Sequence, residues 1–478
     1  MFILIQILAI LGMFFMTYIA FLSFGAPKKN LLFTKADKED WDKSINTGIG
    51  KWFTVTNVVG TLTSLATAYL FFIGNSKPFG WVIFMCAITI WLGSFVTNYF
   101  SKKILSNDYL QKLIESKEQI VGVIATLFWR PNNPVAQRTS WIVRSLSILN
   151  IVSVIWLEFA LFSDIAGRLF SIGELQYRVV VIFVCSFAVL YFTVKYGLRG
   201  FVFADIFQSP IIAISALSLV IGSIILFTQH PIQITPTEFL HPLLPSNQCL
   251  LFALHVTFLN SFFVLVTEGH WLRIWIFGKR ETDLQVKSLS STAIIWLLLI
   301  LIGFFSFFIS GSKTGEDAII SLLIKLNNIS PIFIVLFWLG AVGALFSTAD
   351  AQIYSFLLVN EFDNKKGVLN NKVMDKINPL FLALGFSILF SLAYFIVRYF
   401  GLPFEKIVYI VMPLSLNLLP AFVRASKGYE QKPILIIISV ILYLCCSIVG
   451  FFQPDNSLAW TLCAALMPFI CSVIAFKK

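Results

Sequence analysis

Long apolar runs alternate with short polar segments over the whole chain. Each run holds about 18–25 residues, enough for a helix to cross the hydrocarbon core of a bilayer. The runs are too long and continuous for barrel strands, and lipid cannot satisfy an unpaired backbone. The pattern therefore predicts an all-α membrane protein with about thirteen spans. We place the spans at residues 3–25, 52–74, 80–100, 139–163, 178–196, 201–227, 249–272, 291–310, 331–359, 378–398, 404–423, 433–452 and 458–476.

The polar segments between the runs are short, so no soluble domain is expected. The longest are residues 26–50, 101–138, 228–248 and 360–377. The third contains four prolines and no Lys or Arg, which indicates an external loop. Within 108–129 the spacing of Leu and Ile favours an amphipathic helix on the inner membrane surface.

Composition and charge placement support a membrane protein and suggest its orientation. Hydrophobic residues make up 58% of the 478 residues and charged residues only 12%, whereas soluble domains carry roughly 25%. The net charge of +11 would suggest a nucleic-acid partner in a soluble protein. Here 28 of the 35 basic residues fall on one side of the predicted spans and seven on the other. The seven are Lys77, Arg168, Arg178, Lys313, Lys325, Arg398 and Lys406. The positive-inside rule then predicts a cell-membrane protein with its N-terminus outside and its C-terminus in the cytoplasm.

Six ionisable residues lie at span depth, where each costs roughly 2.5–3.5 kcal/mol on insertion scales. They are Glu158, Asp205, His255, Glu268, His270 and Asp350. Such groups face an interior path or sit near an interface; the alternative is a helix-end or packing group whose polar atoms are satisfied locally.

Two segments concentrate oxygen-bearing side chains. In the first, a turn around Gly200 leads into a helix that carries Asp205 and Gln208 on one face. In the second, GALFSTADAQ at residues 343–352, Ser347 and Thr348 offer adjacent hydroxyls, one turn after Ala344. A small hard cation prefers about five or six oxygens of this kind. Helix capping, back-bonding to the preceding turn, and helix–helix contact are the alternatives.

Both segments resemble the sodium:solute symporter family. Residues 191–208 match its pattern Y-T-x-x-G-G-L-x-A-V-x-x-T-D-x-x-Q at several positions, but depart from it at Tyr196 and Ala204. The matching residues are Tyr191, Thr193, Gly197, Leu198, Val202, Asp205 and Gln208. GALFSTADAQ is similar to the run A-x-x-S-T-x-D-S-Q in the eighth core helix of the family. Residues 267–287 are similar to the end of its sixth core helix, with Arg273 before a basic turn. A positive-inside anchor explains that turn equally well.

The resemblance implies a LeuT-like fold. Two inverted five-helix repeats would occupy residues 52–227 and 249–423, with one helix before them (1–25) and two after (433–476). The first core helix would be unwound near Ser64, within the small and hydroxyl-rich run at 57–67. The family usually carries a Gly-Arg element where this chain has the Lys- and Asp-rich residues 26–50, so the chain resembles a divergent member whose substrate is open.

The resemblance also implies site residues. Carbonyls of Gly60, Thr63 and Ala344 with the hydroxyls of Ser347 and Thr348 would bind sodium. A second ion or a coupling group would involve Asp205, Gln208 and Asp350. Thr67, Asn260, Phe263 and Glu268 are candidates for substrate binding, with an aromatic gate at or near Phe263.

These features predict sodium-coupled symport of a small polar solute such as a sugar, an amino acid or an organic acid. Proton coupling through Asp205 or Glu268 is the nearest alternative, and a non-transporting sensor or partner-binding module on the same fold is another. An enzyme is not expected, because the sequence shows no metal cluster, no nucleophile–base arrangement and no glycine-rich phosphate loop. The expected partners are the solute, sodium and the lipid bilayer, with no cofactor and no nucleic acid; the oligomeric state stays open.

Overall fold

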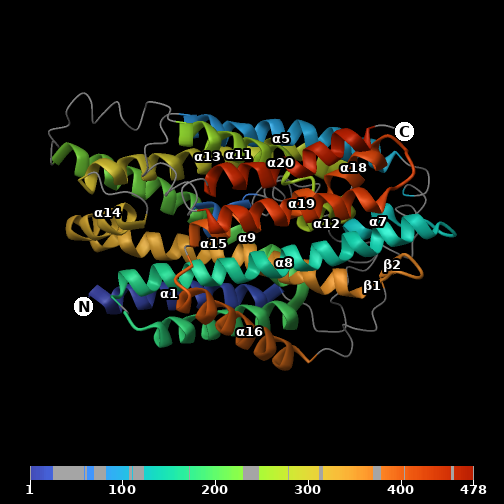
Figure 1. The fold of residues 1–478 in the computed structure, drawn as a ribbon. Helices are drawn as coiled ribbons and strands as arrows, with labels where there is room; N and C mark the ends of the chain where they lie inside the picture. Colours follow the sequence, from blue (N-terminus) through green and yellow to red (C-terminus); the bar gives the residue numbers. More distant parts are fainter. Residues whose placement is uncertain are drawn as a thin grey trace.

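The computed structural model describes most of the chain as helices that run along one common direction (Figure 1). The described residues are 2–24, 59, 62–68, 82–106, 110, 123–171, 173–229, 247–277, 279–311, 316–369, 378–402, 404–453 and 457–476. The predicted loops 26–50 and 228–248 therefore lie outside the described residues, apart from residues 228, 229, 247 and 248.

The long helices follow the apolar runs. They are α1 (Phe2–Phe24), α5 (Val82–Leu105), α8 (Pro134–Leu169), α9 (Leu175–Gln229), α13 (Lys279–Ile309), α15 (Pro331–Glu361), α16 (Pro379–Tyr399), α19 (Pro433–Phe452) and α20 (Ser457–Ala475). Among the described residues, nine helical stretches are long and apolar enough to span a membrane. The all-α fold is confirmed, and the count of thirteen spans stays a prediction.

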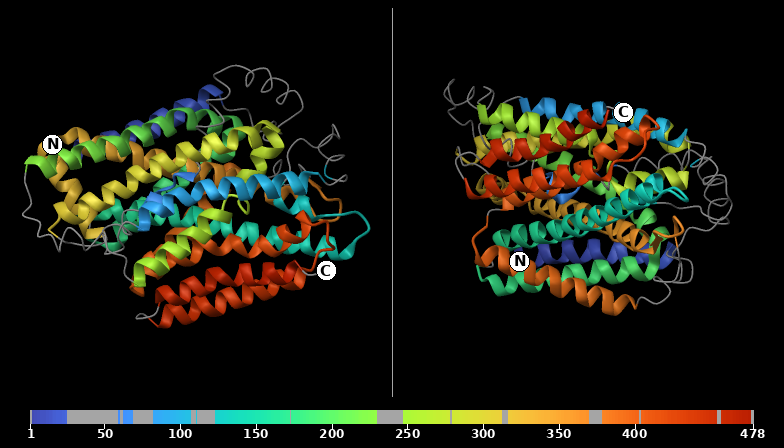
Figure 2. Two further views of the ribbon diagram at one scale, coloured as in Figure 1. Left: turned by 90° about the horizontal axis from the view of Figure 1, so that it is seen from above. Right: turned by 45° about the vertical axis from the view of Figure 1, so that its right-hand side comes forward.

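Shorter elements connect or continue these helices. They are α7 (Ile124–Phe128), α11 (Asn247–Phe262), α12 (Glu268–Phe277), α14 (Glu316–Ile329), α17 (Phe404–Val411), the 3-10 helix η3 (Met412–Leu418), α18 (Leu419–Ser426) and the strands β1 (Phe362–Asp363) and β2 (Val368–Leu369). The two strands pair antiparallel as a small hairpin. In Figure 2, α19 and α20 lie together on one side of the bundle, with α1 on the other.

Three of the long helices begin at an Asn-Pro or Ser-Pro step. Asn133, Ser330 and Asn378 each cap the helix that follows, and each accepts a backbone N–H from the first turn. Proline suits the first helical position because its missing N–H has no partner there and its φ is already helical. These local signals fix the starts of α8, α15 and α16.

The chain reverses direction inside α9. The ring of Phe192 lies 4.8 Å from that of Tyr18, and the Gln208 amide donates to the Thr17 hydroxyl at 3.3 Å. Residues sixteen positions apart in α9 thus contact adjacent residues of α1. The reversal lies around Gly200, where the sequence predicted a turn, and it divides α9 into two apolar stretches, Leu175–Tyr196 and Ala204–Gln229.

The N-terminal helix α1 packs against α9 and α15. The Trp338 indole donates to the Gln6 side chain at 2.7 Å, and the rings of Phe14 and Phe346 meet edge to face at 4.7 Å. Gln6 is fully buried. This helix is therefore joined to the core by polar as well as apolar contacts.

The prediction of a surface helix within residues 108–129 is wrong for its last part, residues 124–128. All five residues of α7, Ile124–Phe128, are buried, and the Ala125 carbonyl accepts a hydrogen bond from Ser140 in α8. The same spacing of Ile and Leu serves a short buried helix as well as a surface one. Most of residues 108–122 lie outside the described residues.

An ionic cluster closes one end of the bundle. The buried carboxylate of Asp164 contacts Arg178 at 3.0 Å, Arg168 at 3.6 Å, and Arg398. Arg168 also reaches Asp317 in α14 at 3.1 Å. Three of the seven basic residues that were assigned to the outer side thus meet at one end of the bundle. Residues on the same side of a membrane have to lie at the same end.

Helices α5 and α11 approach closely at Gly93. A Cβ at this position would overlap the backbone carbonyl of Asn260, which has no room to move without shifting α11. We expect Gly93→Ala to lower the free energy of unfolding by about 1–3 kcal/mol, the usual cost of overpacking. Thermal denaturation of the purified protein in detergent or nanodiscs measures this. Gly385→Ala in α16 is the matched control, because a Cβ there meets nothing within 4 Å. Equal melting temperatures for the two variants would contradict the prediction.

Candidate functional site

The helix after α1 is interrupted at Thr63 and Ser64. Leu62 is helical, these two residues are not, and helical backbone resumes from Leu65 to Ala68. Ser64 begins the second half as its N-cap, because the Thr67 N–H donates to the Ser64 hydroxyl oxygen at 3.0 Å. The interruption lies where the sequence predicted an unwound segment.

The buried carboxylate of Glu158 completes this break. It projects from α8 and accepts the N–H of Leu65 at 2.9 Å and that of Ala66 at 3.2 Å. Free N–H groups at a helix start attract negative charge, which explains why a carboxylate is held there. The sequence indicates that Glu158 lies at span depth, where an ionisable group is energetically costly, but it does not indicate a role. The partners of this carboxylate are backbone groups 92 and 93 residues away.

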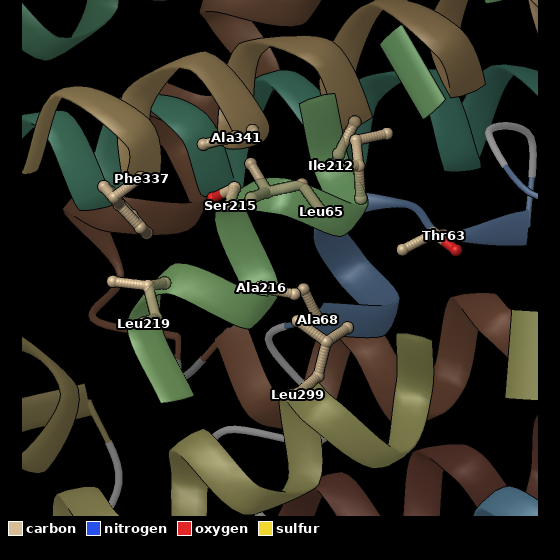
Figure 3. A pocket seen from close by; sticks show the side chains of 12 residues that line it. Thr63, Leu65, Ala68, Ile212, Ser215, Ala216, Leu219, Leu299, Phe337 and Ala341 are labelled. Carbon is tan, nitrogen blue, oxygen red and sulfur yellow. The ribbon is translucent and has the colours of Figure 1, made fainter. Parts of the chain in front are cut away.

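A small pocket lies beside the break (Figure 3). Its volume is about 40 Å³, and Thr63 from the break lines it together with Ala344 from α15. The Thr63 hydroxyl is buried and has no hydrogen-bond partner among the described residues. Gly340 lets α15 approach α9 here, since a Cβ would overlap Ser215. Two of the predicted sodium ligands, Thr63 and Ala344, are thus brought together.

Carboxylates from α9 and α15 meet one turn further along α15. The Ser347 hydroxyl donates to Asp205, and Asp350 is close enough to Asp205 for the two carboxylates to interact electrostatically. All three side chains are fully buried. Among the described residues no side chain donates to the Asp350 carboxylate, and the N–H of the adjacent Ala351 lies beside it. Thr348, on the adjacent position of α15, is also buried.

Gln208 lies one turn after Asp205 but points elsewhere. Its amide nitrogen donates to Thr17 in α1, and its amide oxygen is buried without a partner among the described residues. It therefore links the carboxylate region to α1.

A second helix break separates α11 from α12. The backbone leaves the helix at Phe263 and becomes helical again at Glu268, and the Thr267 hydroxyl donates to the Phe263 carbonyl at 2.6 Å. One carboxylate oxygen of Glu268 accepts the Ile124 N–H at 2.8 Å, and the Ser147 hydroxyl lies beside the carboxylate. The apolar run at residues 249–272 predicts one uninterrupted span, and this break is not visible in the sequence because its residues are mostly apolar.

The predicted substrate residues lie at the two breaks but do not line the pocket. Thr67 shares a hydrogen bond with Ser64 at 3.0 Å, and Asn260 donates to Thr89 at 3.2 Å. Phe263 is half-buried at the second break. Gly60 lies outside the described residues. Each described candidate other than Phe263 thus has a buried side chain held by a neighbour within the protein.

The donor chemistry of the region is that of hard oxygens. Within the part of the chain that the structure describes, no group of three or more His, Cys, Asp or Glu side chains is placed to hold a metal ion. Hydroxyls, carbonyls and single carboxylates suit a weakly held monovalent cation better than a transition metal.

Comparisons with known proteins agree with this arrangement at the level of fold. No protein family and no curated protein matches the sequence. Among solved structures, a Na+-coupled sialic acid symporter in a substrate-bound outward-open state matches with a TM-score of 0.61 at 15% identity, covering 98% of this chain and 97% of that one. MhsT in complex with L-phenylalanine matches with a TM-score of 0.55 at 14% identity, covering 89% of this chain and 97% of that one. The chain is a multi-pass membrane protein with a LeuT-like fold.

Proposed function

We propose that the protein is a secondary active transporter that couples the inward movement of sodium to the symport of a small solute. The observation that carries this proposal is the buried oxygen cluster of Ser347, Asp205 and Asp350 beside an interrupted helix. Neither a passive scaffold nor an open channel needs buried carboxylates next to a broken helix at membrane depth.

The sodium ion would bind between the first break and α15. Carbonyls of Gly60, Thr63 and Ala344 with the hydroxyls of Ser347 and Thr348 supply a largely neutral set of oxygens, which can hold a monovalent ion without trapping it. The Thr63 hydroxyl has no hydrogen-bond partner in the described part of the chain, and Thr63 and Ala344 line one pocket; both observations support this assignment.

A second cation would act at the carboxylates. Asp205 and Asp350 repel each other when both are ionised, and a cation between them removes that repulsion. Gln208, which follows Asp205 by one turn, would fix α1 against this second cation site through its hydrogen bond to Thr17. The burial of Asp350 beside Asp205 favours one alternative, in which a proton takes the place of this ion.

The solute would bind at the two breaks, near Thr67, Asn260, Phe263 and Glu268. In this proposal the repeats 52–227 and 249–423 move against each other to open the site to either side in turn. Each repeat begins with an interrupted helix, which supports the division. The N-terminus would lie outside the cell and the C-terminus inside.

The driving force is sufficient for concentration of a solute. One charge moving inward down 100 mV releases roughly 2.3 kcal/mol, and a tenfold sodium gradient adds roughly 1.4 kcal/mol. Together these support accumulation of a neutral solute on the order of 500-fold.

The test is Ser347→Ala combined with Thr348→Ala. Sodium should raise the thermal midpoint of the purified wild-type protein relative to potassium. In the double variant the half-saturating sodium concentration should rise at least tenfold, since each hydroxyl bonded to a charge contributes about 1.5–3 kcal/mol. Sodium-driven uptake in proteoliposomes should fall in parallel.

The matched control is Thr228→Ala with Ser291→Ala. Within the described part of the chain, these hydroxyls donate to carbonyls of their own helices, at the surface. The control should keep the wild-type sodium response. If sodium has no effect on the wild-type protein but a pH gradient drives solute accumulation, the coupling ion is the proton and not sodium. Solute binding without any flux would indicate a sensor.

A further inference from the structure

Two cysteines occupy matching positions in the hairpin that α19 and α20 form. The two helices lie side by side (Figure 2). Cys446 lies six residues before the last residue of α19, Phe452, and Cys463 lies six residues after the first residue of α20, Ser457. Because a helix rises about 1.5 Å per residue, each cysteine lies about 9 Å from the joined ends of the hairpin. The two thiols therefore share one depth in the bundle.

A second contact along the hairpin fixes which faces of the two helices meet. The Cys471 thiol of α20 lies beside the Ser439 hydroxyl of α19. From this contact, Cys446 follows Ser439 by seven residues, and Cys463 precedes Cys471 by eight residues. Both intervals are about two helical turns, which return a side chain to nearly the same face. Cys446 and Cys463 thus lie on the faces that α19 and α20 turn toward each other.

The two thiols are close in the structure. They interact electrostatically, and Cys463 affects Cys446 more strongly than the adjacent Cys445 does. Cys446 also packs against a buried cluster that contains Tyr443 of α19 and Ala464 of α20. All three cysteines are free thiols in this structure. Cys446 therefore has a second thiol within reach on the neighbouring helix.

Small residues at this contact allow the close approach that a disulfide needs. Ser447 and Gly450 of α19 are buried and follow Ser439 by eight and eleven residues, on the same face. Ala464 and Ala465 of α20 are buried as well. Small side chains let membrane helices pack closely, and a disulfide requires Cα atoms within about 7 Å of each other. Two facing thiols at such a contact can be joined with little movement of either helix.

We propose that Cys446 and Cys463 form a redox site, at which a hydroperoxide converts the two thiols into a disulfide that joins α19 to α20. One sulfur attacks the peroxide, the O–O bond breaks, and a sulfenic acid and an alcohol form, with the thiol proton passing to the alcohol. The second sulfur then displaces the hydroxyl group, which leaves with the second thiol proton as water, and the S–S bond forms. The two sulfurs together lose two electrons, and the hydroperoxide gains them.

The depth of the pair favours this class of oxidant. A hydroperoxide is small and uncharged, so it can enter the apolar region about 9 Å below the helix ends, whereas a charged disulfide such as oxidised glutathione is excluded by the cost of its charges there. In the predicted orientation the joined ends of α19 and α20 lie on the outer side of the membrane. Disulfides persist in oxidising compartments of that kind.

The bond would reinforce a face of α19 that already holds η3. Tyr443, one turn before Cys446, donates to the Ile410 carbonyl, and Ser439 donates to Asn417 of η3 at 2.7 Å. A disulfide beside these contacts would tie α20 to the same assembly. The inference stands independently of the transport function, because it rests on the hairpin alone.

Thiol counting on the full-length protein in nanodiscs tests the proposal. The reduced protein is freed of reductant, incubated with cumene hydroperoxide for several hours, then denatured and alkylated. Wild type should lose two of its seven alkylatable thiols. Mass spectrometry of the proteolytic peptides should find Cys446 linked to Cys463, and reductant should restore both thiols.

Three variants assign the bond to this pair. Cys446→Ser and Cys463→Ser should each abolish the linked peptide. Cys445→Ser is the matched control: Cys445 is adjacent to Cys446 and more exposed, so it would react first if access alone decided the outcome. This variant should form the Cys446–Cys463 bond to the wild-type extent.

Four outcomes would overturn the inference. These are survival of all seven thiols in wild type, a disulfide through Cys445, loss of single thiols without a linked peptide, and a bond that forms with copper phenanthroline but not with the hydroperoxide. The last result would mean that the thiols meet but are not a hydroperoxide-sensitive pair.

Discussion

Asp205→Asn is expected to reduce cation-coupled transport at least about 100-fold while the protein stays folded. Asp205 accepts a hydrogen bond from the Ser347 hydroxyl and interacts with Asp350, so its charge lies where α9 and α15 meet in the proposed cation site. The amide keeps the shape and one acceptor oxygen but removes the charge. Loss of a buried charged partner from a cation costs about 3–5 kcal/mol, more than the 2.7 kcal/mol that a 100-fold loss requires. Exchange of radioactive sodium across proteoliposome membranes measures this without knowledge of the solute.

The control for this prediction is Asp317→Asn. Asp317 is 74% exposed in α14 and lies outside the proposed cation site, so sodium exchange should stay at the wild-type rate. Circular dichroism and size-exclusion profiles should match wild type for both variants. Sodium exchange at the wild-type rate in Asp205→Asn would show that this carboxylate takes no part in coupling.

The second large effect is on stability: Asp164→Asn should lower the free energy of unfolding by about 3–5 kcal/mol. The Asp164 side chain is only 3% exposed and faces Arg168, Arg178 and Arg398. An asparagine leaves three positive charges close together at the end of the bundle without their shared counter-charge. The melting temperature of the purified protein should therefore drop by many degrees.

Asp317→Asn again provides the comparison. It removes the exposed partner of Arg168, and exposed pairs contribute about 0–1 kcal/mol. A drop of equal size in the two variants would mean that burial of the carboxylate does not determine its contribution. High salt should reduce the small effect of Asp317→Asn.

Features encoded locally were predictable from the sequence. The apolar runs predicted the long helices, and the small, hydroxyl-rich residues before Ser64 predicted the first break through the family resemblance. The second break was not predicted, because the residues from Phe263 to Val266 are as apolar as a normal span. A helix interrupted within apolar residues depends on its neighbours, and sequence periodicity does not report them.

Contacts between distant parts of the chain were the harder part. The sequence marked both Asp205 and Ser347, but their hydrogen bond joins positions 142 residues apart. For Glu158 the partners are backbone N–H groups, which every residue except proline carries. No pattern of side chains therefore distinguishes its partners, and only the fold reveals them.

The bond between Gln6 and Trp338 bears on how the protein is made. The two residues are 332 positions apart, and ribosomes add about 5–20 residues per second. Helix α1 thus enters the membrane roughly 15 to 65 s before Trp338 has been synthesised. During that interval the Gln6 amide has to be satisfied by water, lipid headgroups or a membrane chaperone. Biogenesis of this protein is therefore expected to be sensitive to the insertion machinery, with α1 held at the translocon until α15 emerges.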